Sequence, residues 1–287
     1  MYNRKGLTLV EMIALLGILI VIVMLVIVLT KPIHIYSLNM VCSTNLKGMA
    51  NALNVYAFDY RDEYPIAGGG GVNSWAVSTD GWDDTDYQWD GDDKLTVAAS
   101  LFMLVREADV GVKSFICPYG DQQAFVNDLD CDVVELWDFG PSPTEHQSYS
   151  YQFPYGKFPA DGTKNPGNAI MADRNPWFDE NLTKSSIEKE TAKTFKDKVS
   201  LIDFITGTKW KTRIGNSEPH DREGQNVLFN DGHVEFVKRP DAGTGFDNIY
   251  TIGGETQEEK RRGIAPTSDV IDAVDEYDSL LVNDRSQ

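Results

Sequence analysis

The stretch "RKGLTLVEMIALLGILIVIVMLVIVLTKP" at residues 4–32 decides the fold of the N-terminal part of the chain. Its eighteen residues from Met12 to Leu29 carry no charged side chain, and Leu7 to Val10 extend the apolar run toward the N-terminus. A helix needs about 20 apolar residues to cross the roughly 30 Å hydrocarbon layer of a bilayer. A helix of a soluble core would show a polar stripe, and this run has none. We therefore predict a transmembrane helix over residues 7–30.

Glu11 is a carboxylate near the start of this apolar run, and it needs compensation. An ionised side chain inside a membrane costs on the order of 3 kcal/mol on insertion scales. Arg4 and Lys5 precede the run, and this weak positive bias favours a cytoplasmic N-terminus. The following sequence, "TKPIHIYSLNMVC", lacks the small-x-small cleavage site of a secretory signal. We expect the helix to be retained as a single-pass anchor.

The segment "KGLTLVEM" (residues 5–12) resembles the processing site of type IV pilins and type II secretion pseudopilins. The resemblance implies that a prepilin peptidase cleaves after Gly6 and that Leu7 is then N-methylated. It also implies that Glu11 pairs with the ammonium of a neighbouring subunit during assembly, which would compensate its charge. The alternative is a plain signal anchor whose Glu11 reaches the interface by snorkelling. Leu7 stands where the family usually has Phe.

Composition and charge describe the rest of the chain. The net charge of −18 lies almost wholly after residue 58, which argues against binding to nucleic acid or to an anionic membrane surface. It suits a domain outside the cytoplasm that must resist aggregation at high local density. The resemblance implies that the membrane crossed by residues 7–30 is the bacterial inner membrane. The three cysteines, Cys42, Cys117 and Cys131, have no zinc-type spacing, and one disulfide would leave one thiol unpaired.

After the apolar run the sequence predicts an amphipathic continuation of the helix over residues 31–64. Apolar side chains recur there at steps of three and four residues: Leu46, Met49, Leu53, Tyr56 and Tyr60. We expect Pro32 to kink or interrupt the junction and Pro65 to stop the helix. A domain over residues 65–240 follows. We expect the acidic segment 241–287 to be partly ordered, with 249–252 and 280–282 docking as short strands.

Within the domain the patterns predict one helix and several strands. The helix covers residues 94–110, with one apolar face formed by Leu95, Ala98, Leu101, Phe102 and Val105. Strand candidates are "KSFICPYGD" (113–121), "HQSYSYQFPYG" (146–156), "NAIMADRN" (168–175) and "SLIDFI" (200–205). The segment 68–93 is predicted to be a surface loop, and 176–198 a charged insertion.

A β-hairpin is predicted at "GQNVLFNDGHVEFV" (224–237), where apolar alternation flanks Asp231-Gly232. This dipeptide favours a two-residue turn, which would pair Phe229 with Val234 and Val227 with Phe236. These pairs would give the hairpin one apolar face in the core and one face in water.

The hairpin extends the family resemblance, because many bacterial pilin-like proteins carry His, nine residues and then Asp-Gly. Here ten residues separate His220 from Asp231, Gly232 and His233, so the chain departs by one residue. Shorter similar stretches occur in order along nearly the whole chain. The resemblance implies a pilin-like α+β fold in which the long helix packs on an antiparallel sheet with large loop insertions. It also makes a Cys42–Cys117 disulfide plausible, while a Cys117–Cys131 pair and three free thiols remain alternatives.

The sequence gives little reason to expect an enzyme. It has no nucleophile elbow, no His-Glu-x-x-His and no phosphate-binding glycine loop. Asp231 suits the turn, and His233 is expected on the wet face beside it. Calcium is the cofactor that the acidic loops bring into consideration, at Asp128, Asp130 and Asp132 or at the aspartates of 83–93, but no ligand is assigned.

Two functional classes follow. The favoured one is a structural subunit, pilin or pseudopilin, of a type IV pilus-like or type II secretion filament. Its partners would be the prepilin peptidase, copies of itself and other pilin-like subunits, and the inner-membrane assembly machinery. The alternative is a membrane-anchored binding module for calcium or carbohydrate that does not polymerise, with Trp75, Trp82 and Trp89 as a contact platform.

Overall fold

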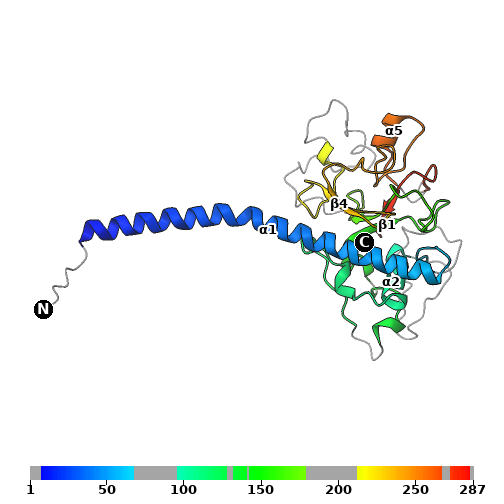
Figure 1. Cartoon of the computed structure of the whole chain (residues 1–287), viewed down its shortest axis with the longest axis horizontal. Coiled ribbons are helices and arrows are strands. Elements are labelled where there is room, and N and C mark those ends of the chain that lie inside the picture. Colours follow the sequence, from blue (N-terminus) through cyan, green and yellow to red (C-terminus); the bar gives the residue numbers. More distant parts are fainter. Residues whose placement is uncertain are drawn as a thin grey trace. The chain divides into compact units, whose positions relative to one another are not determined.

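The computed structural model describes most of the chain as helices, an antiparallel sheet and connecting loops (Figure 1). The structure describes residues 8–67, 96–127, 132–140, 142–178, 212–266 and 272–284. For residues 27–37 it describes the backbone only. The chain forms two compact units, residues 1–40 and 41–287, and we call the second the C-terminal unit. Mixed helix and antiparallel sheet confirm the α+β class, with an apolar N-terminal helix as predicted.

The long helix α1 (Leu9–Asp59) contains 51 residues and spans the boundary between the two units. Its window Leu9–Val26 has a mean hydropathy of 3.1, and the side chains of this window are exposed. Within the described residues this is the one helix long and apolar enough to cross a membrane. The helix continues through Pro32, so the expected interruption is absent, and the expected kink stays a prediction. A proline removes one intrahelical hydrogen bond, and the turns on either side continue the helix.

In the C-terminal unit α1 buries an apolar stripe at helical spacing, as predicted. Its buried side chains are Cys42, Leu46, Met49, Leu53 and Tyr56. The helix ends at Asp59 rather than at residue 64. Arg61 and Asp62 adopt left-handed backbone conformations with φ of 58° and 66°, which reverse the chain before Pro65 is reached. Tyr60 therefore lies beyond the helix and is half exposed, stacked on Tyr56 with ring centroids 4.1 Å apart.

A five-stranded antiparallel sheet has the strand order β4-β3-β2-β1-β5. Its strands are β1 (Tyr149–Gln152), β2 (Ala169–Asp173), β3 (Gln225–Phe229), β4 (Val234–Val237) and β5 (Leu281–Val282). Four predicted strands are thus confirmed: those at 146–156 and 168–175, and the two strands of the hairpin. The candidate at 200–205 lies outside the described residues.

Both faces of the central strands are buried. One face contributes Tyr149, Tyr151, Met171 and Leu228 to the apolar cluster that holds the α1 stripe. The opposite face carries side chains that pack with Trp177 and the C-terminal segment: Ala169, Ala172, Val227, Phe229, Ile249, Tyr250 and Leu281. The expectation that one hairpin face meets water is therefore wrong for β3, because Ile249, Tyr250 and Ala265 cover that face.

The hairpin forms at the predicted place but in a different register. Val227 pairs with Glu235 and Leu228 with Val234, so the predicted pairs are shifted by one residue. The Phe229 N–H donates to His233 O at 3.0 Å, which leaves a three-residue loop instead of a two-residue turn. Gly232 has φ of +81°, the left-handed conformation that completes such a loop. A one-residue shift reverses which face each residue of one strand meets.

Some short elements differ from the prediction, because their backbone groups form other hydrogen bonds than those expected. The strand expected at 113–121 is absent, and Val112–Phe115 form a 3-10 helix instead. Residues 249–252 form only an isolated bridge, between Ile252 and Ile264, whereas Leu281–Val282 pair with β1 as expected. The short helix α5 (Gln257–Arg262), closed by a capping box at Thr256, was not predicted.

The second helix, α2 (Val97–Glu107), matches the predicted one and has an unusual cap at its N-terminus. Thr96 caps Ala99 N–H at 2.9 Å. The Asp284 carboxylate accepts hydrogen bonds from the backbone N–H groups of Val97 and Ala98, both at 2.9 Å. A segment far along the chain thereby satisfies the first N–H groups of this buried helix.

Two buried carboxyl groups meet at this cap. Asp138 accepts hydrogen bonds from the Thr96 hydroxyl at 2.5 Å and from Phe139 N–H at 2.7 Å. Burial, together with a smaller contribution from the Asp284 charge, raises the pKa of Asp138 to about 8. Burial also raises the pKa of Asp284 to about 6.

We predict that the stability of the C-terminal unit falls as pH rises from about 4 to about 8. The folded state keeps the Asp138 proton in this window while the unfolded chain releases it, so the stabilisation present below pH 4 is lost through pH 8. Urea unfolding at pH 5 and pH 9 checks this. The free energy of unfolding should differ less between pH 5 and pH 9 in Asp138→Asn than in wild type, by about 2 kcal/mol or more. Asp132→Asn, at an exposed carboxylate, is the control, and equal profiles for Asp138→Asn and wild type would contradict the assignment.

Candidate functional site

A disulfide joins α1 to the loop before β1. Cys42 lies on the buried stripe of α1 and Cys117 follows the 3-10 helix Val112–Phe115, with Cα atoms 5.2 Å apart. Both residues are fully buried. Asn45, one turn along α1, reinforces the junction by donating to Ile116 O at 2.9 Å. Cys131, the competing partner of Cys117 in the sequence, lies outside the described residues.

Beside the disulfide lies a buried imidazole–carboxylate pair. His220 Nε2 lies 2.9 Å from Asp173 Oδ2, and the two side chains are at most 2% exposed. Asp173 Oδ2 also accepts from the Asn226 backbone N–H at 2.6 Å and from its amide at 3.1 Å. Asp173 is the last residue of β2 and Asn226 lies in β3, so two paired strands hold the carboxylate.

The loop before β3 holds the imidazole in place. Asp221 and Arg222 follow His220 with φ of 52° and 54°, a left-handed pair that costs free energy in non-glycine residues. Buried Arg222 donates to Ile214 O at 2.6 Å, and Asn216 donates to Arg222 O at 3.0 Å. These hydrogen bonds fix a tight turn that directs His220 into the interior.

Aromatic side chains surround the imidazole. The ring of Tyr119 lies 4.8 Å from that of His220, and the ring of Phe236 lies 5.8 Å from it. The Tyr149 hydroxyl accepts from Asn45 at 3.1 Å. Burial raises the pKa of Tyr149 strongly, and the Asp173 charge adds to this rise. The pair is therefore shielded from water by its neighbours.

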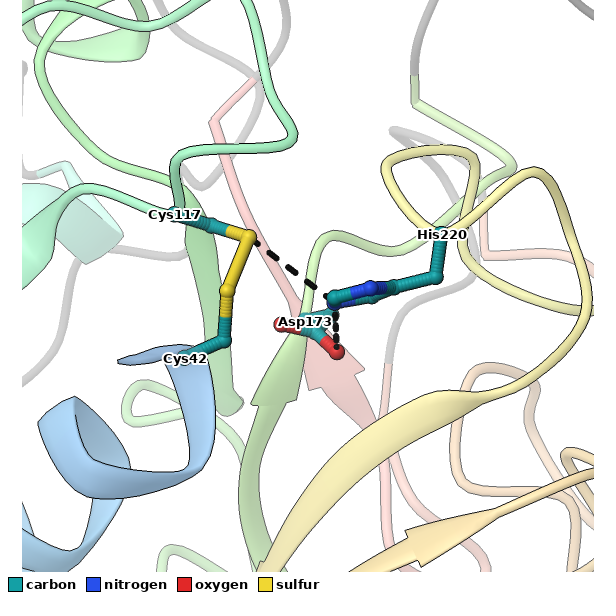
Figure 2. A group of neighbouring side chains, drawn as sticks. All are labelled: Cys42, Cys117, Asp173 and His220. Carbon is teal, nitrogen blue, oxygen red and sulfur yellow. Dashed lines mark hydrogen bonds and ion pairs between the residues drawn. A yellow bond between two sulfur atoms is a disulfide. The ribbon is translucent and has the colours of Figure 1, made fainter. Parts of the chain in front are cut away.

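Figure 2 shows how the disulfide, the imidazole and the carboxylate converge. His220 Nε2 lies 3.8 Å from Cys117 Sγ. We call Cys42, Cys117, Asp173 and His220 the Cys-Asp-His cluster; one ligand atom from each lies within 4.8 Å of all the others. Among the described residues it is the one group of His, Cys, Asp and Glu with this geometry. Its residue types supply two sulfurs, a nitrogen and an oxygen, which are the donors of zinc sites.

The remaining residues of the His-Asp-Gly motif do not join His220. Asp231 Oδ1 accepts from the backbone N–H of His233 at 2.9 Å and contacts its ring nitrogen Nδ1 at 2.5 Å. The backbone N–H of His233 is the main cause that lowers the pKa of Asp231. The His233 ring stacks on Phe229, and Lys47 of α1 donates to Gly232 O at 2.5 Å. The exposed hairpin loop is thus attached to α1, while His220 pairs with Asp173 on β2 instead.

Glu11 has a local partner at the start of α1. Its carboxylate accepts from the backbone N–H of Thr8 at 2.8 Å and from the Thr8 hydroxyl at 2.9 Å. The Thr8 hydroxyl in turn lies 3.4 Å from the Glu11 N–H, as in a capping box. Gly6 and Leu7, the predicted processing residues, lie outside the described residues.

Most of the candidate calcium and carbohydrate residues also lie outside the described part of the chain: Trp75, Trp82, Trp89, the aspartates of 83–93, Asp128 and Asp130. Asp132 is described and exposed. Sequence reasoning missed Asp173 and Asn226. Their only signal was a strand pattern, which does not tell which loop residue a strand end meets. Comparison of the chain with protein-family models, curated proteins and solved structures gave no match.

Proposed function

We propose that the chain is a structural subunit, pilin or pseudopilin, of a type IV pilus-like or type II secretion filament. In this proposal prepilin peptidase cleaves after Gly6, Leu7 is methylated, and Glu11 guides assembly. The subunit sits in the bacterial inner membrane with its N-terminus in the cytoplasm until it enters the filament.

The observation that carries the proposal is the two-part character of α1. Over Leu9–Val26 the helix is apolar and its side chains are exposed, as a membrane or a bundle of like helices requires. From Cys42 to Tyr56 the same helix buries one stripe against an antiparallel sheet. A retained anchor continuous with a domain-packing helix supports a subunit that carries its domain on the helix. The net charge of −18 supports crowding of such domains without aggregation.

The contacts of Glu11 refine the assembly part of the proposal. In the unprocessed chain its carboxylate binds to Thr8, next to the proposed cleavage site. Cleavage would release an ammonium group on Leu7, and a neighbouring subunit's Glu11 would neutralise it. A buried ion pair of this kind sets the register of the helices, because misaligned subunits leave charges unpaired.

The first test is processing. Co-expression of the full chain with a prepilin peptidase should remove residues 1–6 and leave one methyl group on Leu7, as seen by mass spectrometry of the intact protein. Gly6→Ala should abolish the cleavage. An intact leader on the wild-type chain beside an active peptidase would refute the proposal and favour a non-polymerising, membrane-anchored binding module.

Three substitutions separate the charge of Glu11 from its capping role, with filament incorporation as the measurement. Glu11→Gln keeps the capping geometry but removes the charge, and it should be processed yet fail to enter filaments. Glu11→Ala removes both and should behave like Glu11→Gln. Thr8→Ala removes the cap partner, keeps the charge, and should still assemble. Normal incorporation of Glu11→Gln would exclude charge pairing.

A further inference from the structure

We propose that the Cys-Asp-His cluster is a redox-gated zinc site, in which reduction of the Cys42–Cys117 disulfide creates a buried tetrahedral site for one Zn²⁺. The ligands are the two thiolates, His220 Nε2 and one carboxylate oxygen of Asp173. This inference does not depend on the proposed filament role.

The geometry already approaches that of a zinc site. Zn–N and Zn–O bonds of about 2.0 Å and Zn–S bonds of about 2.3 Å place tetrahedral ligand atoms roughly 3.3–3.8 Å apart. In the oxidised cluster Nε2 lies 3.8 Å from Cys117 Sγ, and 2.9 Å from Asp173 Oδ2, the oxygen of the same carboxylate that Asn226 holds. No pair among the four ligand atoms is separated by more than 4.8 Å. The site then needs the two sulfurs to separate by on the order of 1–2 Å once their bond is broken.

Two buried polar atoms in the cluster point to a ligand as well. Within the described residues neither Asp173 Oδ1 nor His220 Nδ1 has a hydrogen-bond partner. Buried polar atoms are nearly always paired, so the free carboxylate oxygen is an unused donor of an electron pair in a dry interior. Asn226 holds the other oxygen through two hydrogen bonds, which is how outer residues usually orient a carboxylate ligand.

The chemical steps balance. A thiol or phosphine reductant supplies two electrons to the disulfide, the S–S bond breaks, and each sulfur takes up one proton. Zn²⁺ then binds both thiolates and displaces the two protons into solvent. In the oxidised cluster Nε2 lies 2.9 Å from Asp173 Oδ2 and donates its proton to that oxygen. On zinc binding Nε2 gives up this proton and Nδ1 takes one up, so the ring keeps one proton and binds the metal through Nε2. Zinc is favoured over calcium because sulfur and imidazole are its preferred donors.

The two forms of the cluster link different numbers of chain segments. The disulfide joins α1 to the loop before β1. The zinc form would join these two segments to β2 through Asp173 and to the loop before β3 through His220. Reduction followed by zinc binding would therefore replace a link between two residues by a link among four. It would not release α1 from the C-terminal unit.

The test uses the full chain in detergent, with Zn²⁺ as the probe and a phosphine as the reductant, because phosphines do not compete for zinc as dithiols do. A moderate chelator removes zinc held by exposed acidic residues. We expect the reduced protein to retain about one Zn²⁺ per chain and the oxidised protein to retain less than about 0.1 Zn²⁺ per chain. With Co²⁺, the reduced chain should show thiolate-to-metal charge-transfer absorption. Equal zinc retention in both redox forms, or none after reduction, would overturn the proposal.

Variants identify the ligands. Asp173→Asn is nearly isosteric and should weaken zinc binding at least about tenfold. Near-UV circular dichroism of its oxidised form checks that the variant is folded. Cys131→Ala is the matched control and should retain one Zn²⁺. In reduced wild type, zinc should slow alkylation of Cys42 and Cys117 but not of Cys131. Loss of binding in Cys131→Ala, or unchanged binding in Asp173→Asn, would show that zinc is bound elsewhere.

Discussion

Replacing Cys42 and Cys117 together by alanine should lower the free energy of unfolding of the C-terminal unit by about 4 kcal/mol. The disulfide closes a loop with a sequence separation of 75 residues, and its removal restores that entropy to the unfolded chain. The loss is a large fraction of the 5–15 kcal/mol typical of a folded domain. Urea unfolding of the oxidised chain with excess chelator measures it, because the chelator excludes any contribution from metal.

The location of the disulfide adds to the entropic term. Cys42 begins the buried stripe of α1, and without the link this end of the stripe depends more on Asn45 and on apolar packing. We therefore expect hydrogen exchange near Cys42 to increase more than at Leu53, farther along the helix. Asn54→Ala, on the exposed side of α1, is the control and should leave the unfolding free energy within about 0.5 kcal/mol of wild type. A loss below about 1 kcal/mol in the double variant would contradict this account.

The second large effect is expected at Asn175, where Asn175→Ala should destabilise the C-terminal unit by about 3 kcal/mol. The side chain is fully buried. Its amide donates to Tyr250 O at 2.9 Å and to Leu281 O at 2.7 Å, and its oxygen accepts from Trp177 N–H at 2.9 Å. Alanine would leave two carbonyl groups and one N–H group without these partners, and each orphaned group costs about 1–3 kcal/mol before relaxation.

Asn175 matters because it holds three distant segments together on the face of the sheet opposite α1. Its backbone N–H also bonds to the Ser150 hydroxyl of β1 at 2.7 Å. Urea unfolding measures the loss, and near-UV circular dichroism should report disturbed packing of Trp177. Asn54→Ala, on the exposed side of α1, is the matched control and should change stability by less than about 0.5 kcal/mol. Equal effects of the two substitutions would refute the role of Asn175.

The sequence predicts best what depends on local periodicity. The apolar run and the stripe from Leu46 to Tyr56 define α1, and α2 follows from the same rule. The end of α1 was misplaced because the left-handed residues Arg61 and Asp62 reverse the chain before Pro65. Neither is glycine, so no residue type marked that reversal.

The hairpin shows where local rules are insufficient. Asp231-Gly232 indicates a turn, yet the same dipeptide fits a two-residue and a three-residue loop. The structure adopts the longer loop, in which Lys47 contacts Gly232 O and the His233 ring stacks on Phe229. These tertiary contacts form in one register only. The alternation of residues within the strands does not predict them.

The candidate site was accessible to sequence reasoning only in part. The resemblance suggested Cys42 with Cys117 and drew attention to His220, but it linked His220 to the hairpin. The partner is Asp173, whose position in space depends on how β2 and β3 pair. Partners of this kind depend on sheet topology, and no spacing in the sequence encodes the order of the strands.

The capping of α2 by Asp284 has a consequence for biosynthesis. Val97 and Ala98 emerge early from the ribosome, but the carboxylate that binds their N–H groups is added almost two hundred positions later. Until then the start of that helix lacks its acceptor and the β1 edge lacks β5. The nascent polypeptide should therefore stay export-competent through most of its translation, and tertiary closure should come as one late event.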